Sequence, residues 1–97
     1  MYEVQQTSVF VAWHKALRDR QAQGRITARL LRLALGNFGD AKPVGDGVHE
    51  LRMTFGPGYR VYFARRGERI ILLLCGGDKG SQSRDIAQAK QMASELE

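Results

Sequence analysis

The chain has 97 residues, of which 43% are hydrophobic, and this length predicts a single domain over residues 1–97 with one small core. The longest apolar run, residues 70–75, is far too short to cross a bilayer, and the first residues lack the basic segment followed by an apolar stretch that is typical of a signal peptide. We therefore expect a cytoplasmic protein with no membrane partner. The formal net charge of +5 favours anionic partners such as nucleic acid or an acidic protein.

The first third of the chain predicts a short strand followed by two helices. Residues 2–7 suit a strand, and Thr7 or Ser8 is expected to cap a helix that ends near residues 19–22. A second helix is expected from about residue 23 to residue 35, where Gly36-Asn37 ends it. The side of this helix opposite its apolar face carries a basic stripe that consists of Arg25, Arg29 and Arg32.

The middle of the chain predicts a glycine-rich loop over residues 36–47 and then a three-stranded meander. Residues 48–55 and 59–65 alternate between apolar and polar side chains, and the Gly-Pro-Gly sequence between them predicts a tight turn. Residues 69–75 are almost continuously apolar, as expected of an interior strand covered on both faces.

A last helix is expected from about residue 81 or 83 to residue 96, with a narrow apolar stripe. The predicted order is therefore β-α-α-β-β-β-α. This order indicates an α+β fold with a small, mainly antiparallel sheet, an N-terminal helical hairpin and a C-terminal helix.

The alternation in the meander also predicts a polar face on its first two strands. Arg52 lies on that face of one strand, and Arg60 and Tyr62 lie on that face of the next. Lys79 follows the third strand closely enough to join them. Arginine suits a phosphate because its planar fork donates two parallel hydrogen bonds and keeps its charge. Tyr62 is a candidate to stack on a base, with packing inside the sheet as the alternative.

Several motifs, taken together, cover essentially the whole chain. They are Phe10-x-x-Trp13, Arg25-Ile26-x-x-Arg29, Gly36-Asn37-x-Gly39-Asp40-x-Lys42, Val48-x-Glu50-Leu51-Arg52, Gly56-Pro57-Gly58-Tyr59-Arg60-Val61-Tyr62, Gly77-Asp78-Lys79 and Gln82-x-x-Asp85-Ile86-x-x-Ala89. In these motifs the chain resembles the RelE/ParE superfamily of type II toxin–antitoxin toxins, specifically the HigB-like addiction module killer proteins. The resemblance implies the fold of that superfamily, a small sheet that carries an N-terminal helical hairpin.

The resemblance also implies a function. The chain is expected to be a toxin that a cognate antitoxin, a small DNA-binding protein, holds inactive. Relatives of the RelE and HigB type enter the ribosome and cut messenger RNA: the ribose 2′-OH attacks the adjacent phosphate, with no metal or other cofactor. By this resemblance Arg60 contacts the phosphate, Arg52 is a catalytic basic residue, and Lys79 is a further basic residue of the site.

The remaining candidates are assigned to RNA binding rather than to chemistry. Tyr62 is expected to contact a base, and the basic stripe is expected to contact ribosomal RNA or the antitoxin, with a merely solvated helix face as the alternative. Several relatives carry a functional tyrosine or histidine near the C-terminus, whereas residues 80–97 contain neither. The candidates for that role are then Tyr62, Tyr59 and His49.

Two other functions remain open at this point. Toxins of the ParE type share the fold but poison DNA gyrase and have no ribonuclease activity. A non-catalytic binding module of the same fold is the other alternative. The sequence leaves the target, the codon preference and the oligomeric state open.

Overall fold

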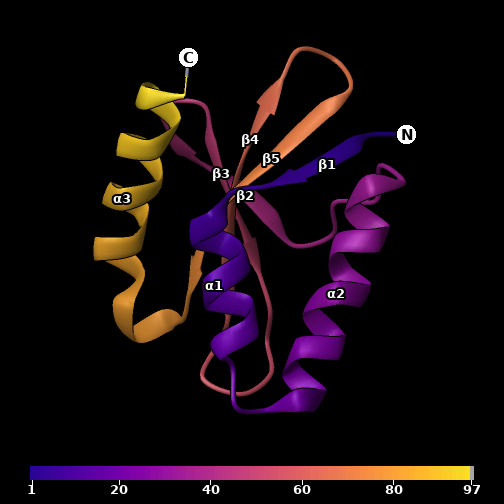
Figure 1. Cartoon of the computed structure of the whole chain (residues 1–97), viewed down its shortest axis with the longest axis vertical. Coiled ribbons are helices and arrows are strands. Elements are labelled where there is room, and N and C mark those ends of the chain that lie inside the picture. The colour runs from indigo at the N-terminus through magenta and orange to yellow at the C-terminus, as the bar shows by residue number, and fades with distance from the viewer. Residues whose placement is uncertain (97) are drawn as a thin grey trace.

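The computed structural model describes residues 1–96 and forms a layered α+β domain (Figure 1). Its elements, in chain order, are β1 (Glu3–Gln6), α1 (Ser8–Ala16), α2 (Arg20–Ala34), β2 (Ala41–Gly45), β3 (Val48–Arg52), β4 (Arg60–Arg66), β5 (Ile70–Gly77), a 3-10 turn (Lys79–Ser81) and α3 (Gln82–Glu95). The α+β class, the helical hairpin and the C-terminal helix are confirmed. The order contains one strand, β2, that the sequence did not predict.

The sheet has the strand order β1-β5-β4-β3-β2. Strands β2 to β5 form a continuous antiparallel meander, and β1 returns to pair with β5 in parallel at the opposite edge. The mainly antiparallel sheet is therefore confirmed. Strand β5 lies between β1 and β4, as its continuous apolar sequence predicted.

Strand β2 lies within the segment that was predicted to be a loop, residues 36–47. It pairs with β3 at the edge of the sheet, and the register shifts between Pro43 and Gly45. Proline has no N–H to donate, so it is tolerated in a strand mainly at a sheet edge or a bulge. Pro43 lies in an edge strand and next to the register shift, so it meets both conditions. The prediction of a loop over 41–45 was wrong because such an edge strand has neither the alternation nor the composition of a typical strand.

Helices cover both faces of the sheet: α2 lies on one side and α3 on the other, while α1 lies beside the end of β1 (Figure 1). The side chains buried beneath α1 and α2 form the larger core, which contains Phe10, Ile26, Leu33, Leu51, Met53, Val61, Phe63, Ile71 and Leu73. The side chains buried beneath α3 form a second core, which contains Val48, Tyr62, Ala64, Leu74, Cys75, Ala89 and Ala93. A β-bulge opposite Tyr62 and Phe63 turns both Leu74 and Cys75 toward α3.

Polar contacts fix the first helix and the last helix against the end of β5. The Thr7 side chain accepts a hydrogen bond from the Phe10 N–H (3.1 Å) and donates one to the Leu74 carbonyl (2.7 Å), so the cap of α1 is tied to the sheet. Just past the same end of β5, the Ser81 hydroxyl donates to the buried carboxylate of Asp85. Within residues 1–96, no helix is both long and apolar enough to cross a membrane.

Candidate active site

An open pocket of about 680 Å³ lies at the end of the sheet where β3 and β4 are joined. Helix α3 covers the face of the sheet around Tyr62 but leaves the end near Arg52 and Arg60 uncovered. The residues that line the pocket are Asp40, Lys42, Arg52, Met53, Thr54, Gly56, Pro57, Gly58, Arg60, Lys79 and Gln82. The structure thus brings Arg52, Arg60 and Lys79, the three predicted catalytic residues, into one pocket. Their catalytic role remains a prediction.

The sheet register explains why the two arginines meet. Arg52 and Arg60 are directly paired across β3 and β4, and cross-strand partners point to the same face. Lys79 reaches them from the 3-10 turn after β5, where its backbone N–H donates to the Pro57 carbonyl (3.4 Å). Gly58, at φ +78°, has a left-handed backbone conformation that favours glycine, and its Cβ position lies 3.4 Å from Cβ of Lys79 and 3.5 Å from Nη1 of Arg60.

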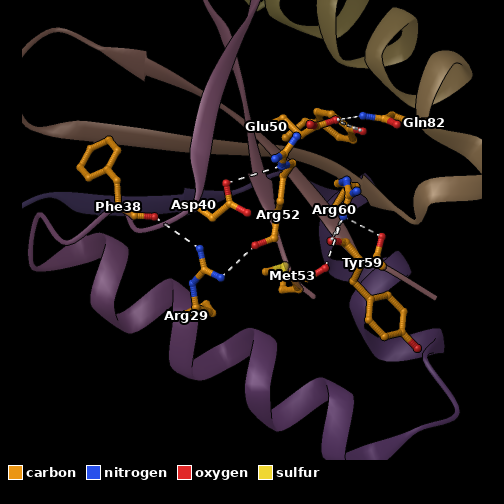
Figure 2. Close-up of polar contacts among 11 residues, drawn as sticks. Arg29, Phe38, Asp40, Glu50, Arg52, Met53, Tyr59, Arg60 and Gln82 are labelled. Carbon is orange, nitrogen blue, oxygen red and sulfur yellow. Dashed lines mark hydrogen bonds and ion pairs between the residues drawn. The ribbon is translucent and has the colours of Figure 1, made fainter. Parts of the chain in front are cut away.

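Arg60 is held in position by the loop that precedes it. Its Nη1 donates to the carbonyl oxygens of Met53 (3.3 Å), Gly58 (3.1 Å) and Tyr59 (3.2 Å), as Figure 2 shows. Its Nε is buried and has no hydrogen-bond partner among residues 1–96. The hydrogen bonds of Arg60 within the described residues all use Nη1, so Nη2 is the guanidinium nitrogen that remains available to an oxyanion in the pocket.

Arg52 is less constrained than Arg60. Its Nε lies 3.5 Å from Oδ1 of Asp40, and the two side chains are 36% and 50% exposed. An ion pair this exposed contributes little to stability, so the guanidinium can exchange Asp40 for a ligand at low cost. The backbone of Arg52 is well fixed: its N–H donates to the Asp40 carbonyl (2.9 Å), and its carbonyl accepts from Nη1 of Arg29 (2.9 Å).

The basic stripe of α2 lies beside the loop between β3 and β4, with Arg25 and Arg32 exposed and Arg29 half-buried. Arg25, Arg29 and Arg32 line a second pocket of about 300 Å³ together with Ala28, Met53, Thr54 and Phe55. Met53 and Thr54 belong to both pockets, so the two are adjacent. The Arg25 guanidinium lies 5.0 Å from the centre of the Phe55 ring, a cation–π contact.

Arg29 differs from its two neighbours because it also holds the scaffold together. Besides its bond to the Arg52 carbonyl, its Nη2 donates to the Phe38 carbonyl (3.4 Å), so it ties α2 to β3 and to the segment before β2 (Figure 2). Burial, and then the charge of Arg32, lowers the pKa of Arg29 from its ordinary value. RNA binding by the three arginines remains a prediction, and for Arg29 a structural role stands beside it.

The expectation of an accessible Tyr62 is wrong. Tyr62 lies on the predicted face, but α3 covers it and its side chain is 0% exposed. Its hydroxyl donates to Oε2 of Glu50 (3.0 Å), and burial, followed by that hydrogen bond, raises the pKa of the phenol. A fully buried ring offers no surface on which a base could stack. The packing alternative is therefore the one that the structure supports.

The other two candidates for a catalytic aromatic or histidine also pack within the protein. Tyr59 contacts the rings of Trp13 and Phe55, with centroids 6.2 and 5.8 Å apart. His49 stacks on Phe63 at 5.3 Å, and its Nδ1 is buried without a partner among the described residues. Neither residue lines the pocket that contains Arg52 and Arg60.

Sequence reasoning missed four polar residues of the pocket, Asp40, Lys42, Thr54 and Gln82, of which Lys42 and Gln82 bear most on its chemistry. Lys42 was assigned to a loop, but in β2 it pairs with Glu50 and so faces the same side of the sheet as Arg52. Gln82 begins α3, and its Nε2 donates to Oε2 of Glu50 (2.8 Å; Figure 2). Both residues lie in motifs noted in the sequence, which was the one available signal for them. Within residues 1–96, no three histidine, cysteine or carboxylate side chains are grouped so as to hold a metal ion.

Comparison with known proteins identifies the family. The phage-derived Gp49-like family (DUF891) matches residues 13–95, which is most of the chain. The chain belongs to the Gp49-like family. It is also 47% identical, over 97% of its own length and 95% of the relative's, to an uncharacterized protein of Haemophilus influenzae (strain ATCC 51907 / DSM 11121 / KW20 / Rd). The Gp49-like family is related to the RelE/HigB toxin superfamily, so the resemblance seen in the motifs is confirmed at this coarser level.

Proposed function

We propose that this Gp49-like protein is the toxin of a type II toxin–antitoxin pair and that it cleaves messenger RNA on the ribosome. The observation that carries the proposal is the convergence of Arg52, Arg60 and Lys79 on one open pocket at the end of the sheet. The pocket is of a size to admit a nucleotide, and its charged lining is suited to a phosphodiester. The relation of the Gp49-like family to RelE/HigB toxins supports the same conclusion.

The proposed reaction breaks the RNA backbone by internal attack. The 2′-oxygen of a ribose bonds to the adjacent phosphorus, the bond from phosphorus to the 5′-oxygen breaks, and the products carry a 2′,3′-cyclic phosphate and a 5′-hydroxyl. The proton of the 2′-OH must leave, and the departing 5′-oxygen must gain a proton. Negative charge grows on the two non-bridging oxygens during the attack, so fixed cations around them lower the barrier.

The structure suggests different roles for the three basic residues. Three carbonyl oxygens fix Arg60 through Nη1, and its Nη2 has no hydrogen-bond partner among residues 1–96, so Arg60 suits the non-bridging oxygens, whose charge increases in the transition state. Arg52 can leave Asp40 and take a second phosphate oxygen. Lys79 is the candidate for proton transfer, because a lysine can release its proton whereas arginine stays charged.

The proposed partners follow from charge. Ribosomal RNA would meet the basic stripe of α2, which lies next to the pocket through Met53 and Thr54. The antitoxin would offer an acidic or amphipathic segment that covers one of these two basic surfaces. Association of this kind is fast at low salt and slows as salt rises. No cofactor enters the proposal, and the protein would act in the cytoplasm.

A gyrase poison of the ParE type is the second candidate. It is favoured by one observation, the absence of any tyrosine or histidine from residues 80–97, where several ribonuclease relatives carry one. A gyrase poison needs a basic surface that is complementary in shape to its target, but it needs no catalytic residue. It therefore predicts that the pocket residues matter for binding alone.

The test is to mix purified protein with ribosomes that carry a defined messenger RNA and, separately, with DNA gyrase. The proposal expects cleavage of the ribosome-bound message by the wild type and none by Arg60→Ala. Arg69→Ala is the control, since it removes the same charge at the opposite end of β4 and β5, outside both pockets. Intact message together with trapped gyrase–DNA complexes would contradict the proposal and support the second candidate.

A further inference from the structure

Glu50 is a buried acid whose two hydrogen bonds both reach one oxygen. Its side chain is 0% exposed, and Oε2 accepts from the Tyr62 hydroxyl (3.0 Å) and from Nε2 of Gln82 (2.8 Å). Its Oε1 is buried and has no hydrogen-bond partner among residues 1–96. Burying an acid with one oxygen unpaired costs free energy, so this arrangement requires an explanation beyond packing.

The consequence of this arrangement is the orientation of the Gln82 amide. A carboxylate accepts hydrogen bonds and donates none, so it fixes the NH₂ group of Gln82 toward Glu50. The carbonyl oxygen, Oε1, must then point the other way, and it takes part in no hydrogen bond within the described part of the chain. Glu50 therefore leaves an amide acceptor of fixed orientation on a residue that lines the pocket.

This acceptor differs from the other polar side chains of the pocket. Lys42, Arg52, Arg60 and Lys79 are all cations that only donate. The Asp40 carboxylate also accepts, but it is half-exposed and its ion pair with Arg52 can open, so its orientation is not fixed. The Thr54 hydroxyl rotates freely, whereas the Gln82 amide is locked. Phosphate oxygens satisfy the cations but cannot satisfy an acceptor. A ligand that matches the whole pocket must carry a hydrogen-bond donor next to its phosphate.

We infer that Gln82, oriented by Glu50, is the specificity residue of the pocket and accepts a hydrogen bond from a donor beside the bound phosphate. In a nucleotide this donor is either the ribose 2′-hydroxyl or an amino group of the base. The inference rests on the proposed function, in which the pocket holds a nucleic-acid phosphate. Glu50 acts through Gln82 and is a positioning residue.

The test is an NMR titration of the isotope-labelled protein with four probes. They are sulfate, cytidine 3′-monophosphate, its 2′-deoxy form and uridine 3′-monophosphate. Sulfate is a tetrahedral anion without a proton to donate. The 2′-deoxy probe lacks only the ribose hydroxyl, and the uridine probe has a carbonyl in place of the base amino group and an N3–H donor in place of the N3 acceptor. The variants are Gln82→Met, which keeps the length of the side chain and removes the acceptor, Glu50→Gln, and the exposed control Gln88→Met on the same helix.

Cytidine 3′-monophosphate carries both candidate donors. We expect the wild type and Gln88→Met to bind it about threefold to tenfold more tightly than the nucleotide that lacks the recognised donor, the usual range for one neutral hydrogen bond. A preference over the 2′-deoxy probe assigns the donor to the ribose, and a preference over uridine assigns it to the base. Gln82→Met should lose the preference and still bind sulfate. Glu50→Gln should reduce the preference, because a neutral amide no longer dictates which end of Gln82 it faces.

Two results would overturn the inference, and they differ from a failure of the proposed function. Equal affinity of the wild type for all three nucleotides would show that no donor is recognised, and an unchanged preference in Gln82→Met would place the acceptor elsewhere. Gln82→Met tests directly whether Gln82 is the acceptor, so the inference can still be tested if Glu50→Gln does not fold. If the wild type binds neither sulfate nor any nucleotide, the anion pocket itself, and the proposed function with it, is contradicted.

Discussion

The side chain of Arg60 is held by three carbonyl oxygens of its own loop, whereas Arg52 is half-buried with one exposed ion pair and Lys79 is exposed. A fixed cation is worth more to a transition state than a mobile one, since it needs no reorganisation when charge develops. Among the predicted catalytic residues, Arg60 is therefore the one whose geometry matters most.

Arg60→Lys should lower the rate of message cleavage by about 10²–10³-fold, the loss that typically follows removal of one fixed donor from a developing oxyanion. Lysine keeps the charge, but its ammonium cannot bridge the three carbonyls and also present a second donor. Single-turnover cleavage on programmed ribosomes measures the effect, with Arg69→Lys as the control. A rate within twofold of wild type would show that charge alone suffices at this position.

Cys75 should react slowly with alkylating reagents as long as the protein is folded. Burial, and secondarily the charge of Asp85, raises the pKa of the thiol from 9.0 to about 12, so little thiolate is present at pH 8. Because the folded value is the higher one, this residue's contribution to stability is complete below pH 9 and is lost as the pH rises toward 12. Alkylation rates with and without urea test this; equally fast labelling in both would contradict it.

At the level of the elements, the end of β5 is shaped by two glycines that let other side chains approach. A Cβ on Gly76 would lie 2.3 Å from Cε3 of Trp13 on α1, and a Cβ on Gly77 would lie 1.8 Å from Oδ2 of Asp85 on α3. The strand end thus brings a helix close on each face of the sheet. Lys79 and Gln82 follow directly, so the packing of these glycines also positions one side of the pocket.

Gly77→Ala should lower the free energy of unfolding by about 1–3 kcal/mol, the usual cost of forcing an extra methyl into a filled space. Gly24→Ala is the matched substitution, because no atom lies within 4 Å of its Cβ position in the middle of α2. It should raise the free energy of unfolding by about 0.5–1 kcal/mol, since alanine is the better helix former. Urea denaturation of both variants measures the difference; equal stabilities would refute the packing account.

The elements that the sequence predicted are those with strong periodicity. The alternation of β3 and β4 and the turn between them sufficed to place Arg52 opposite Arg60.

Strand β2 was missed because Pro43 and its glycines remove the strand signal. The burial of Tyr62 was missed because alternation shows which face a residue shares but not which part of that face a distant helix covers. Gln82 was missed for the same reason: its contact with Glu50 joins residues far apart in the sequence.

On the scale of the whole molecule, the two pockets form neighbouring basic surfaces that share Met53 and Thr54 of the loop between β3 and β4. The first contains the predicted catalytic residues, and the second contains the arginines of α2. In the proposed function, RNA contacts both surfaces, and the first carries the chemistry while the second contributes binding energy. The two proposed roles can be tested by different substitutions.

The double variant Arg25→Gln/Arg32→Gln should bind ribosomes more weakly and with a flatter dependence on salt. Each lost phosphate contact should reduce the slope of log affinity against log salt by about 0.7–0.9. Arg29 is left unchanged because it also holds the carbonyls of Arg52 and Phe38. The double variant Arg18→Gln/Arg20→Gln, with exposed residues outside both pockets, changes the net charge equally. If the slope of log affinity against log salt is equal in the two double variants, the basic stripe is a solvated helix face and not an RNA-binding surface.

The central claim is that the convergent cations cleave messenger RNA by attack of the 2′-hydroxyl. It is tested most directly by mapping RNA ends that carry a 5′-hydroxyl after brief induction of the protein in cells. The account predicts new 5′-hydroxyl ends within translated reading frames for the wild type and for Arg69→Ala, and none for Arg60→Ala. Growth arrest by the wild type without such ends in translated messages would contradict it.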